Sequence, residues 1–536
     1  MKPMSKKILP TKEYSVRLGD AAFPKPFYQG LEFNAPAHGN WNIVHIGMLL
    51  PEARQIYVCA DNCMRGVVLT AAEMNAADRF SFVLLDEADM TVGNIEEVTI
   101  DGVSQCIDRL DKHPPVILLF TVCVHHFLGC DLDYVYKRLG KKYPDIFFAR
   151  CYMDPLLQKT KPTPDQKLRS AMYDPIRPLP VNKNVISLIG SELPLHKDSD
   201  IYRIIEIVSG HPAANAGGQV CNTVLKGLAP EYFLPVHTSG EAPDQASSAH
   251  CYKTADNAPS GGIELKEIST CTSFDEYLSM GESALFISDF PGALMGLEHL
   301  GKRLGRPYVY LPMSFDYDEI SALWKRFAGA LYINCISDAS AKENNSCTQE
   351  SDALPYAHIY DTDAACMLPD NISERTELGI SEQKRLCEEA LSNLRTLIGA
   401  IEIRIDYVFH PRPLGLARLL LSHGFNVSTV YIDVISSEEE ADMEWLKANA
   451  PDLMLCSTVQ AEARVKKRNA PYVLAIGQKA AWFSGTSHFV NAVYGAGLWG
   501  FNGIIRLTRL MEQAYIEEKD TEDLIIRKGW GCASCV

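Results

Sequence analysis

The sequence lacks the features that would place it in several common classes of protein. No uninterrupted apolar stretch approaches about 18 residues, so no membrane-spanning helix is predicted. The basic residues at positions 1–10 are not followed by the apolar core of a signal peptide, so we expect a cytoplasmic protein. No glycine-rich phosphate-binding motif stands between a predicted strand and a predicted helix. We therefore expect that this chain itself binds no nucleotide.

Positive charge is also scarce. The chain has 51 Lys and Arg residues against 67 Asp and Glu residues, which gives a formal net charge of −16. An acidic surface repels nucleic acids and anionic membranes, so neither is predicted as a partner. Hydrophobic residues make up 47% and charged residues 22% of the chain, as in ordinary globular proteins, which excludes extensive disorder.

Cysteine, in contrast, is abundant. The 536 residues include 16 cysteines. In a reducing compartment, cysteines are more typical of metal sites than of disulfides. The cysteine content is therefore the first indication of chemistry in this sequence.

Short apolar runs alternate with amphipathic helical stretches along the chain, a pattern typical of buried parallel strands in βαβ units. The predicted strands lie at 55–59, 80–85, 115–120, 145–149, 184–189, 283–287, 307–311, 403–409, 426–432, 453–456 and 471–475. Because a single core stops growing at about 250–300 residues, this length predicts several domains. The predicted fold class is α/β, with three Rossmann-like domains whose mostly parallel sheets are flanked by helices.

Changes in composition suggest the domain limits. A proline-rich segment at 175–180 separates the first two blocks, and polar, weakly patterned stretches at 238–262 and 339–370 interrupt the second. The predicted division, in four parts, is 1–183 for a first domain that carries the cysteine motifs, 184–394 for a second domain with polar insertions, 395–515 for a third domain, and 516–536 for a C-terminal tail.

Two predicted strands of the first domain lead into cysteines. One strand runs directly into Cys123, and another ends at Cys59, with Cys63 four residues further on in a turn before the next predicted helix. Open α/β sheets bind ligands at the carboxyl ends of their strands, and a nearby helix N-terminus favours a thiolate. We therefore predict a metal site here, with Cys130 as a further candidate ligand.

Other cysteines and histidines have a plainer interpretation. Buried thiols often only fill a core, and this is the reading we favour for four cysteines in apolar or helical contexts, Cys106, Cys335, Cys387 and Cys456. The adjacent pair His125-His126 could bind metal, but neighbouring residues point in different directions, so at least one is expected to be structural. The Cys532-x-x-Cys535 pair is either a redox or metal motif or part of a mobile tail.

These motifs resemble those of nitrogenase component 1 and its relatives. Cys123, followed by Gly129 and Asp131, is similar to the family's Ser/Thr-x-Cys-x5-Gly-Asp-Asp element, and segment 58–63 is similar to its cysteine-terminated turn. Segments 284–308 and 497–503 are similar to the family's second-domain strand and turn and to its third-domain Gly-Tyr/Phe-Asp-Gly element. The resemblance touches all three predicted domains, over most of residues 37–515.

The resemblance implies an iron–sulfur oxidoreductase subunit. It implies a 4Fe-4S or P-cluster-like centre held by Cys63 and Cys123, electrons from an ATP-dependent, iron-protein-like iron–sulfur reductase, and a small-molecule substrate. It further implies a homodimer or a pair with a homologous subunit, in which both chains supply cluster ligands. The alternative is a non-catalytic scaffold for metal-cofactor assembly, and a third reading is a binding module that has lost the cluster.

The sequence also departs from that family. The family's earlier cysteine has no counterpart in segment 36–40, so either Cys59 or His38 substitutes for it or the ligand comes from elsewhere. Cys130 stands where the family has an aspartate. The positions of the family's catalytic-cofactor ligands, near Asp289 and near residue 490, hold neither the expected Cys nor the expected His, so no iron–molybdenum cofactor is expected.

The ends of the predicted strands in the second and third domains carry polar and aromatic groups instead. We predict that His410, Arg412 and His488 bind a cofactor or substrate, which would be organic or anionic rather than a sulfide cluster. Ser288, Asp289, Phe290, Tyr494 and Trp499 belong to the same set of strand ends. The alternative for His410 and Arg412 is that they only cap a helix in a βα turn.

Overall fold

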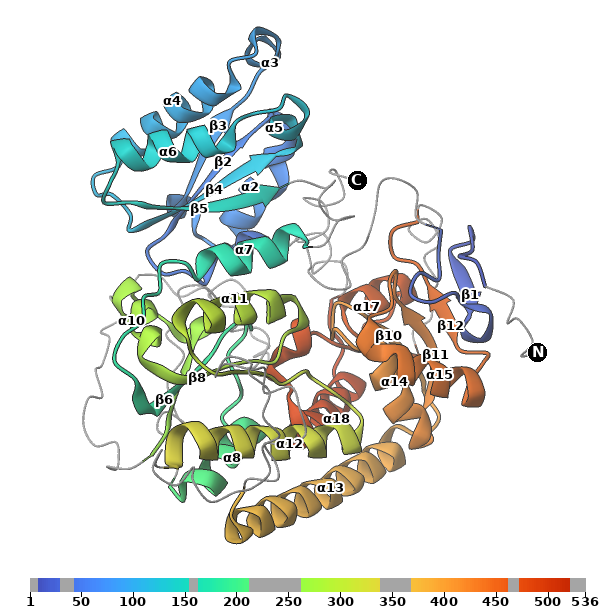
Figure 1. Ribbon diagram of the computed structural model, residues 1–536. Coiled ribbons are helices and arrows are strands. Elements are labelled where there is room, and N and C mark those ends of the chain that lie inside the picture. Colours follow the sequence, from blue (N-terminus) through green and yellow to red (C-terminus); the bar gives the residue numbers. More distant parts are fainter. Residues whose placement is uncertain are drawn as a thin grey trace, which may run out of the picture.

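The computed structural model describes residues 8–28, 43–153, 162–211, 262–337, 368–460 and 472–520. These residues form three sheets, each covered by helices (Figure 1). The prediction of an α/β protein with mostly parallel sheets is confirmed. None of the described helices is long and apolar enough to cross a membrane. His38, Cys532 and Cys535 lie outside the described residues, as do most of the two polar stretches.

The first sheet has the strand order β3-β2-β4-β5 and is entirely parallel. Every residue of β4 is buried, as expected for a strand covered by helices on both faces. One face packs against α1, α2 and α7, and the other against α4 and α6. The bounds are α1 (Ile43–Met48), β2 (Arg54–Cys59), α2 (Asp61–Glu73), β3 (Phe80–Leu84), α3 (Glu87–Val92), α4 (Ile95–Asp108), β4 (Val116–Val122), α5 (Cys123–Phe127), α6 (Leu132–Lys142), β5 (Phe147–Met153) and α7 (Pro164–Met172).

The second sheet has the order β7-β6-β8-β9 and is also parallel. Helix α11 ends at Gly305, whose backbone is left-handed (φ 62°), so glycine suits the turn into β9. The bounds are β6 (Asn182–Leu188), α8 (Asp200–Ser209), β7 (Glu264–Glu267), α10 (Phe274–Ser279), β8 (Ser283–Ser288), α11 (Leu294–Leu304), β9 (Tyr308–Tyr310) and α12 (Tyr317–Leu331).

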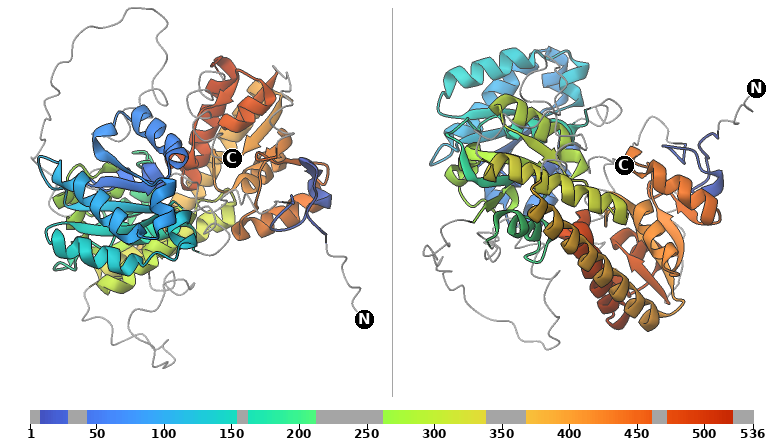
Figure 2. Two further views of the ribbon diagram at one scale, coloured as in Figure 1. Left: turned by 90° about the horizontal axis from the view of Figure 1, so that it is seen from above. Right: turned by 60° about the horizontal axis from the view of Figure 1, so that its bottom comes forward.

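The third sheet has the order β1-β12-β11-β10-β13-β14 and is parallel except for β1, which pairs antiparallel with β12. Figures 1 and 2 show β1, from the start of the chain, against the C-terminal part of the molecule. The predicted domain limits remain a prediction. The bounds are β1 (Ser15–Arg17), α13 (Asp370–Ile398), β10 (Glu402–Asp406), α14 (Pro413–Ser422), β11 (Asn426–Tyr431), α15 (Glu440–Asn449), β12 (Met454–Cys456), β13 (Val473–Ile476), α17 (Gln478–Ser484), β14 (Phe489–Val490) and α18 (Gly500–Ile516).

Each predicted strand overlaps a strand of the structure. The sequence reading missed β1, β7 and β14. These strands have two to four residues, and β7 reads Glu-Leu-Lys-Glu, which contains no apolar run to recognise. Short edge strands of this kind form because a partner strand is already in place, which local pattern does not reveal.

In each sheet the chain first adds strands on one side of a central parallel strand and then crosses over to the other side of it. In the first sheet the chain runs from β2 outward to β3 and then crosses back to β4 on the other side of β2. The same crossing separates β6 from β8 and β10 from β13. Ligands of open α/β sheets bind at the carboxyl ends of the two strands that flank such a crossing. The three strand pairs therefore define where sites are expected.

The glycine-rich segment 497–503 joins the second and third sheets. Asp200 Oδ2, at the start of α8, accepts hydrogen bonds from the backbone N–H of Phe501 (2.6 Å) and from Trp324 Nε1 (3.1 Å). Gly500 has a positive φ of 70°, and a Cβ at this position would clash with Asp200. The glycine is thus required by packing between domains, which accounts for one of the motifs of the family resemblance without assigning it chemistry.

Candidate functional site

Cys63 and Cys123 follow the carboxyl ends of two adjacent strands of the first sheet. Strands β2 and β4 pair with Tyr57 opposite Phe120, and continuing that register places Cys59, the last residue of β2, beside the end of β4. Cys123 directly follows β4 as the first residue of α5, and Cys63 is the third residue of α2. Both side chains are half-buried. We call this strand-end region, with Cys59, Cys63 and Cys123, the cysteine edge.

Helix α2 begins earlier than the sequence suggested. It starts at Asp61, whereas the sequence predicted a helix over 67–74. Cys63 therefore lies in the first turn of the helix rather than in a loop. The N–H of Cys63 donates to the Ala60 carbonyl (3.0 Å), and Asp61 adds a negative charge that favours a helix N-terminus. The earlier start was missed because Asn62 and Gly66 are weak helix formers. The first turn of a helix favours a thiolate, so this correction strengthens Cys63 as a ligand.

Cys59 lies beneath the surface of the cysteine edge. Its side chain is fully buried, and burial raises the pKa of its thiol to about 12, with smaller contributions from the nearby Cys63 and Asp61. Cys59 would ligate a metal only as a thiolate, so binding would have to displace its proton.

Cys130 is not brought to the cysteine edge. It packs against the cluster formed by α4 and α6, which cover the opposite face of the sheet from α2. Burial, together with the carboxylate of Glu96 in α4, raises the pKa of its thiol to about 12. The chain turns at Gly129 (φ 66°), which directs the following residue away from Cys123. The placement of Cys130 in a shared ligand set with Cys63 is therefore a prediction that the geometry does not favour.

The adjacent histidines point in different directions, as expected. His125 is buried, its Nδ1 accepts the backbone N–H of Val122 (3.3 Å), and its Nε2 lies 3.4 Å from Thr99 Oγ1. Burial lowers the pKa of His125 to about 4, so it is neutral. His126 instead stacks on Tyr152, with ring centroids 6.0 Å apart. These contacts give His125 a structural role.

A buried arginine links the first sheet to the strand ends of the second. Arg169, in α7, is 1% exposed, and its guanidinium contacts Asp165 (2.7 Å) and Glu192 (2.8 Å). It also donates to the Gly190 carbonyl and lies 4.9 Å from the centre of the Phe290 ring. Gly190 and Glu192 follow β6, so α7 holds the loop at the crossing point of the second sheet.

Asp289 is a buried carboxyl group at that crossing point, without hydrogen-bond donors from other described residues. It directly follows β8, is fully buried, and neither of its carboxylate oxygens accepts a hydrogen bond from another described residue. Burial raises its pKa to about 6. Glu267, at the end of β7 on the other side of β6, is also buried and has a pKa raised to about 7, chiefly by burial. Two carboxyl groups that hold protons close to neutral pH therefore lie at the strand ends of this sheet.

Asp289→Asn is expected to stabilise the protein above pH 6. Because the folded-state pKa is raised, the folded protein binds the proton more tightly than the unfolded chain, so stability falls as pH rises from about 4 to 6. The neutral amide removes this loss, which is about 3 kcal/mol at pH 8 and is absent at pH 4. Melting temperatures at pH 4.5 and pH 8 test this.

The matched control for this prediction is Asp133→Asn, because the Asp133 side chain is 81% exposed. It should change stability by less than about 0.5 kcal/mol at either pH. A less stable Asp289→Asn protein at pH 8 would show that the carboxylate makes a favourable contact after all.

Arg412 and His410 occupy structural positions. Arg412 is 4% exposed and is held by Glu319 (2.8 Å) and Asp442 (3.3 Å), at the N-terminus of α14. His410 is buried, accepts the N–H of Arg412 through Nδ1 (3.0 Å), and lies 4.5 Å from the Phe315 ring. Burial lowers its pKa to about 3, so its ring carries no charge. These contacts favour the alternative reading, in which both residues organise a βα turn.

His488 does not converge with them. Its Nδ1 lies 3.1 Å from the Ala514 carbonyl, where it anchors the end of α18 to the start of β14. His410 lies beside Gly495, where an added Cβ would lie 3.4 Å from its ring. The three residues therefore do not form a single site.

The fold can be compared with that of known proteins. A solved structure of nitrogenase Cp1 at pH 6.5 matches with a TM-score of 0.50 and 13% sequence identity, over 91% of this chain and 94% of that chain. The chain has a nitrogenase component 1 fold. The structure of nitrogenase Cp1 at pH 5 gives a TM-score of 0.49 and 10% identity, over 96% of each chain. No protein-family model and no curated protein matches the sequence.

This match confirms the fold that the family resemblance predicted. Folds do not specify side-chain chemistry, so the site rests on the geometry described above. Among the described residues, no group of three or more His, Cys, Asp or Glu side chains is arranged to hold a metal ion.

Exposed apolar side chains flank the cysteine edge of the component 1 fold. Val68 and Leu69 on α2 are 45% and 38% exposed, and Phe127 and Leu128 at α5 are 71% and 43% exposed. We call these four residues the apolar rim. Apolar side chains gathered on a surface are typical of sites that contact another protein.

Proposed function

We propose that this chain is an iron–sulfur oxidoreductase subunit whose cluster is held by Cys63 and Cys123, with Cys59 as a third thiol behind them. The observation that carries the proposal is the position of Cys63 and Cys123 after adjacent parallel strands, at the crossing point of the first sheet. Thiolates are the ligands that iron–sulfur clusters take, and both side chains are half-buried. Such a cluster would supply one-electron chemistry.

The remaining ligands would come from a second copy of the chain or from a homologous subunit. One observation supports this pairing: the apolar rim is exposed on and next to α2 and α5, the two helices that carry Cys63 and Cys123. Burial of the rim would exclude water from the cluster, which helps to set its reduction potential. A reductase of the iron-protein type would deliver electrons to the pair, as the family resemblance implies.

The substrate would bind where the strand ends of the second and third sheets meet. Asp289 and Arg169 provide a buried proton-holding group and a fixed cation there, and Phe290 lies 6.3 Å from the Tyr494 ring. These groups suit an organic molecule better than a metal–sulfide cofactor, so we propose no iron–molybdenum cofactor in this chain. At neutral pH Asp289 is poised to hold or release a proton at its carboxyl group.

Anaerobic purification followed by iron, acid-labile sulfide and EPR measurements tests the proposal. Near-stoichiometric iron and sulfide, with an EPR signal after reduction, is the expected result. Protein without iron would favour the binding module. A cluster that accepts electrons from a low-potential donor but passes them to no small molecule would favour the assembly scaffold. Stoichiometric molybdenum or vanadium would contradict the proposed cleft.

Phe127→Asp is expected to separate the proposed pair. A charge in the centre of an apolar contact is costly to desolvate, so sedimentation at about 0.1 µM should show a dimer for the unaltered protein and a monomer for the variant. Val92→Asp is the matched control, because Val92 is similarly exposed (76%) but lies on α3, outside the apolar rim. A metal-loaded monomer of the unaltered protein would contradict the shared-ligand proposal.

A further inference from the structure

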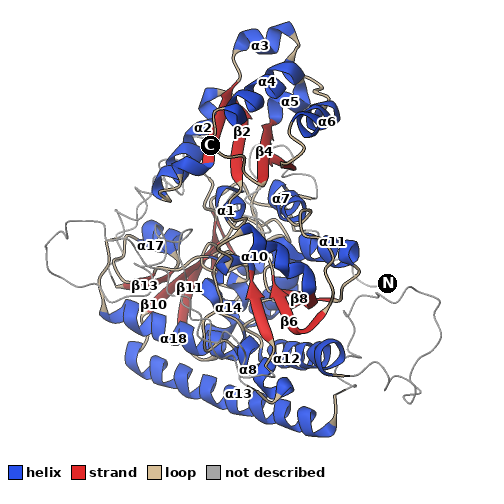
Figure 3. Ribbon diagram, turned by 90° about the vertical axis from the view of Figure 1, so that its left-hand side faces the viewer, coloured by secondary structure: helices blue, strands red, loops and turns tan. Residues whose placement is uncertain are grey.

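A groove of about 570 Å³ lies between α13 and α18. Figures 1 and 3 show α13 on the side of the molecule opposite the first sheet, so the groove is remote from the cysteine edge. Its lining comes from three helices, since α8 contributes Arg203 and the other residues belong to α13 and α18. The groove thus spans helices of the second and third sheets.

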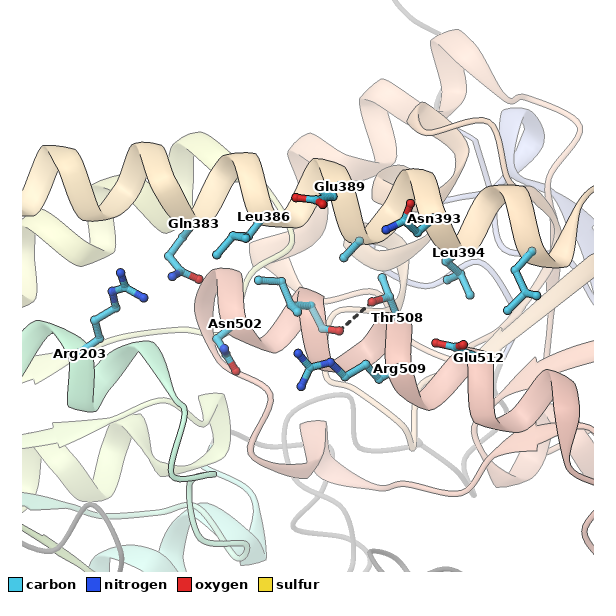
Figure 4. Close-up of a pocket in the computed structure, with 13 residues that line it drawn as sticks. Arg203, Gln383, Leu386, Glu389, Asn393, Leu394, Asn502, Thr508, Arg509 and Glu512 are labelled. Atoms are coloured by element: carbon cyan, nitrogen blue, oxygen red, sulfur yellow. Dashed lines mark hydrogen bonds between the residues drawn. The ribbon is translucent and has the colours of Figure 1, made fainter.

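The floor of the groove contains two amide oxygens that lack hydrogen-bond donors. Gln383, in α13, is 2% exposed, and its Oε1 accepts no hydrogen bond from any described residue. The buried Oδ1 of Asn502, near the start of α18, also accepts no hydrogen bond from any described residue. Figure 4 shows Gln383 extending from α13 toward Asn502. Buried oxygens are rarely left unsatisfied, so this pair indicates a donor that a bound molecule supplies.

Two arginines lie at the same end of the groove. Arg203 and Arg509 stand on either side of Asn502 in Figure 4. Arg203 forms an ion pair with Glu382 (2.7 Å), whereas no described carboxylate pairs with the exposed Arg509. Arg509 therefore carries a positive charge at this end of the groove that no described carboxylate neutralises.

We propose that the groove binds a small organic anion that carries a hydroxyl group, such as a hydroxycarboxylate. Its carboxylate groups pair with Arg203 and Arg509, and its hydroxyl donates to the Oε1 of Gln383. Glu389 and Glu512 also line the groove, and Figure 4 places Glu512 beyond Arg509, away from the two amides. The carboxylate of Glu512 repels a longer polyanion and restricts the ligand to the arginine end, whereas Glu389 lies between Leu386 and Asn393 on α13.

Isothermal titration of the full-length protein with L-malate and with succinate tests this proposal, because the two anions differ by one hydroxyl group. We expect malate to bind about 2–10-fold more tightly than succinate. Arg509→Gln should weaken malate binding at least about tenfold, since a charged hydrogen bond is lost. Gln383→Leu should bring the two affinities together.

Arg375→Gln is the matched control for Arg509→Gln, since Arg375 is an exposed arginine of α13 that does not line the groove. Its affinity for malate should equal that of the unaltered protein, and circular dichroism verifies that each variant is folded. The proposal is overturned if neither anion binds, if both bind equally to the unaltered protein, or if Arg509→Gln leaves malate binding unchanged. None of these measurements depends on a cluster at the cysteine edge.

Discussion

Replacing Cys63 or Cys123 with alanine is expected to remove most of the iron from anaerobically purified protein. Each thiolate contributes to the free energy of metal binding, so a cluster that loses one of its few protein ligands dissociates. Iron content per chain, measured by inductively coupled plasma spectrometry, should fall to a small fraction of that in the unaltered protein. Full iron content in both variants would remove the central claim about this site.

Two further alanine variants separate the cysteine edge from the other thiols. Cys456→Ala should retain iron, because Cys456 lies buried in β12 of the third sheet. Cys130→Ala tests the geometry more sharply, since this residue lies seven positions from Cys123 but packs against α4 and α6. We expect it to retain iron. Loss of iron in Cys130→Ala would show that the first sheet uses both of its faces to hold the cluster.

Arg169→Met is expected to lower the free energy of unfolding by about 3–5 kcal/mol. Removing one member of a buried ion pair leaves its partner charged without compensation, and Asp165 is 4% exposed on its side chain. The variant also loses the contacts to Glu192 and to the Gly190 carbonyl. Urea unfolding monitored by tryptophan fluorescence gives the comparison.

The control for this prediction is Arg138→Met, because Arg138 is 49% exposed and lies 3.5 Å from Glu97. Exposed pairs contribute little, so it should change stability by no more than about 1 kcal/mol. The double variant Arg169→Met, Asp165→Leu should recover part of the loss, since no unpaired charge from that pair remains. If Arg169→Met unfolds like the control, the arginine does not hold the first and second sheets together.

The strands were predictable because each is a continuous apolar run, and the position of Cys123 followed directly from the run that ends at Val122. Side chains with distant partners were not. Arg412 could be taken for a ligand because its partner Glu319 lies 93 residues away in α12. Arg169 was missed for the same reason: only its contact with Asp165, four residues earlier, is visible in the sequence, whereas Gly190 and Glu192 are supplied by the fold.

The antiparallel pairing of β1 with β12 joins Ser15 to Cys456, residues that are separated by most of the chain. During synthesis β1 is made well before β12, so the pair can form only after β12 has been made. A β12 strand that has not yet paired with β1 is an unprotected edge, whose unpaired backbone groups can pair with another chain. Pairing with β1 therefore protects this edge of the third sheet from aggregation.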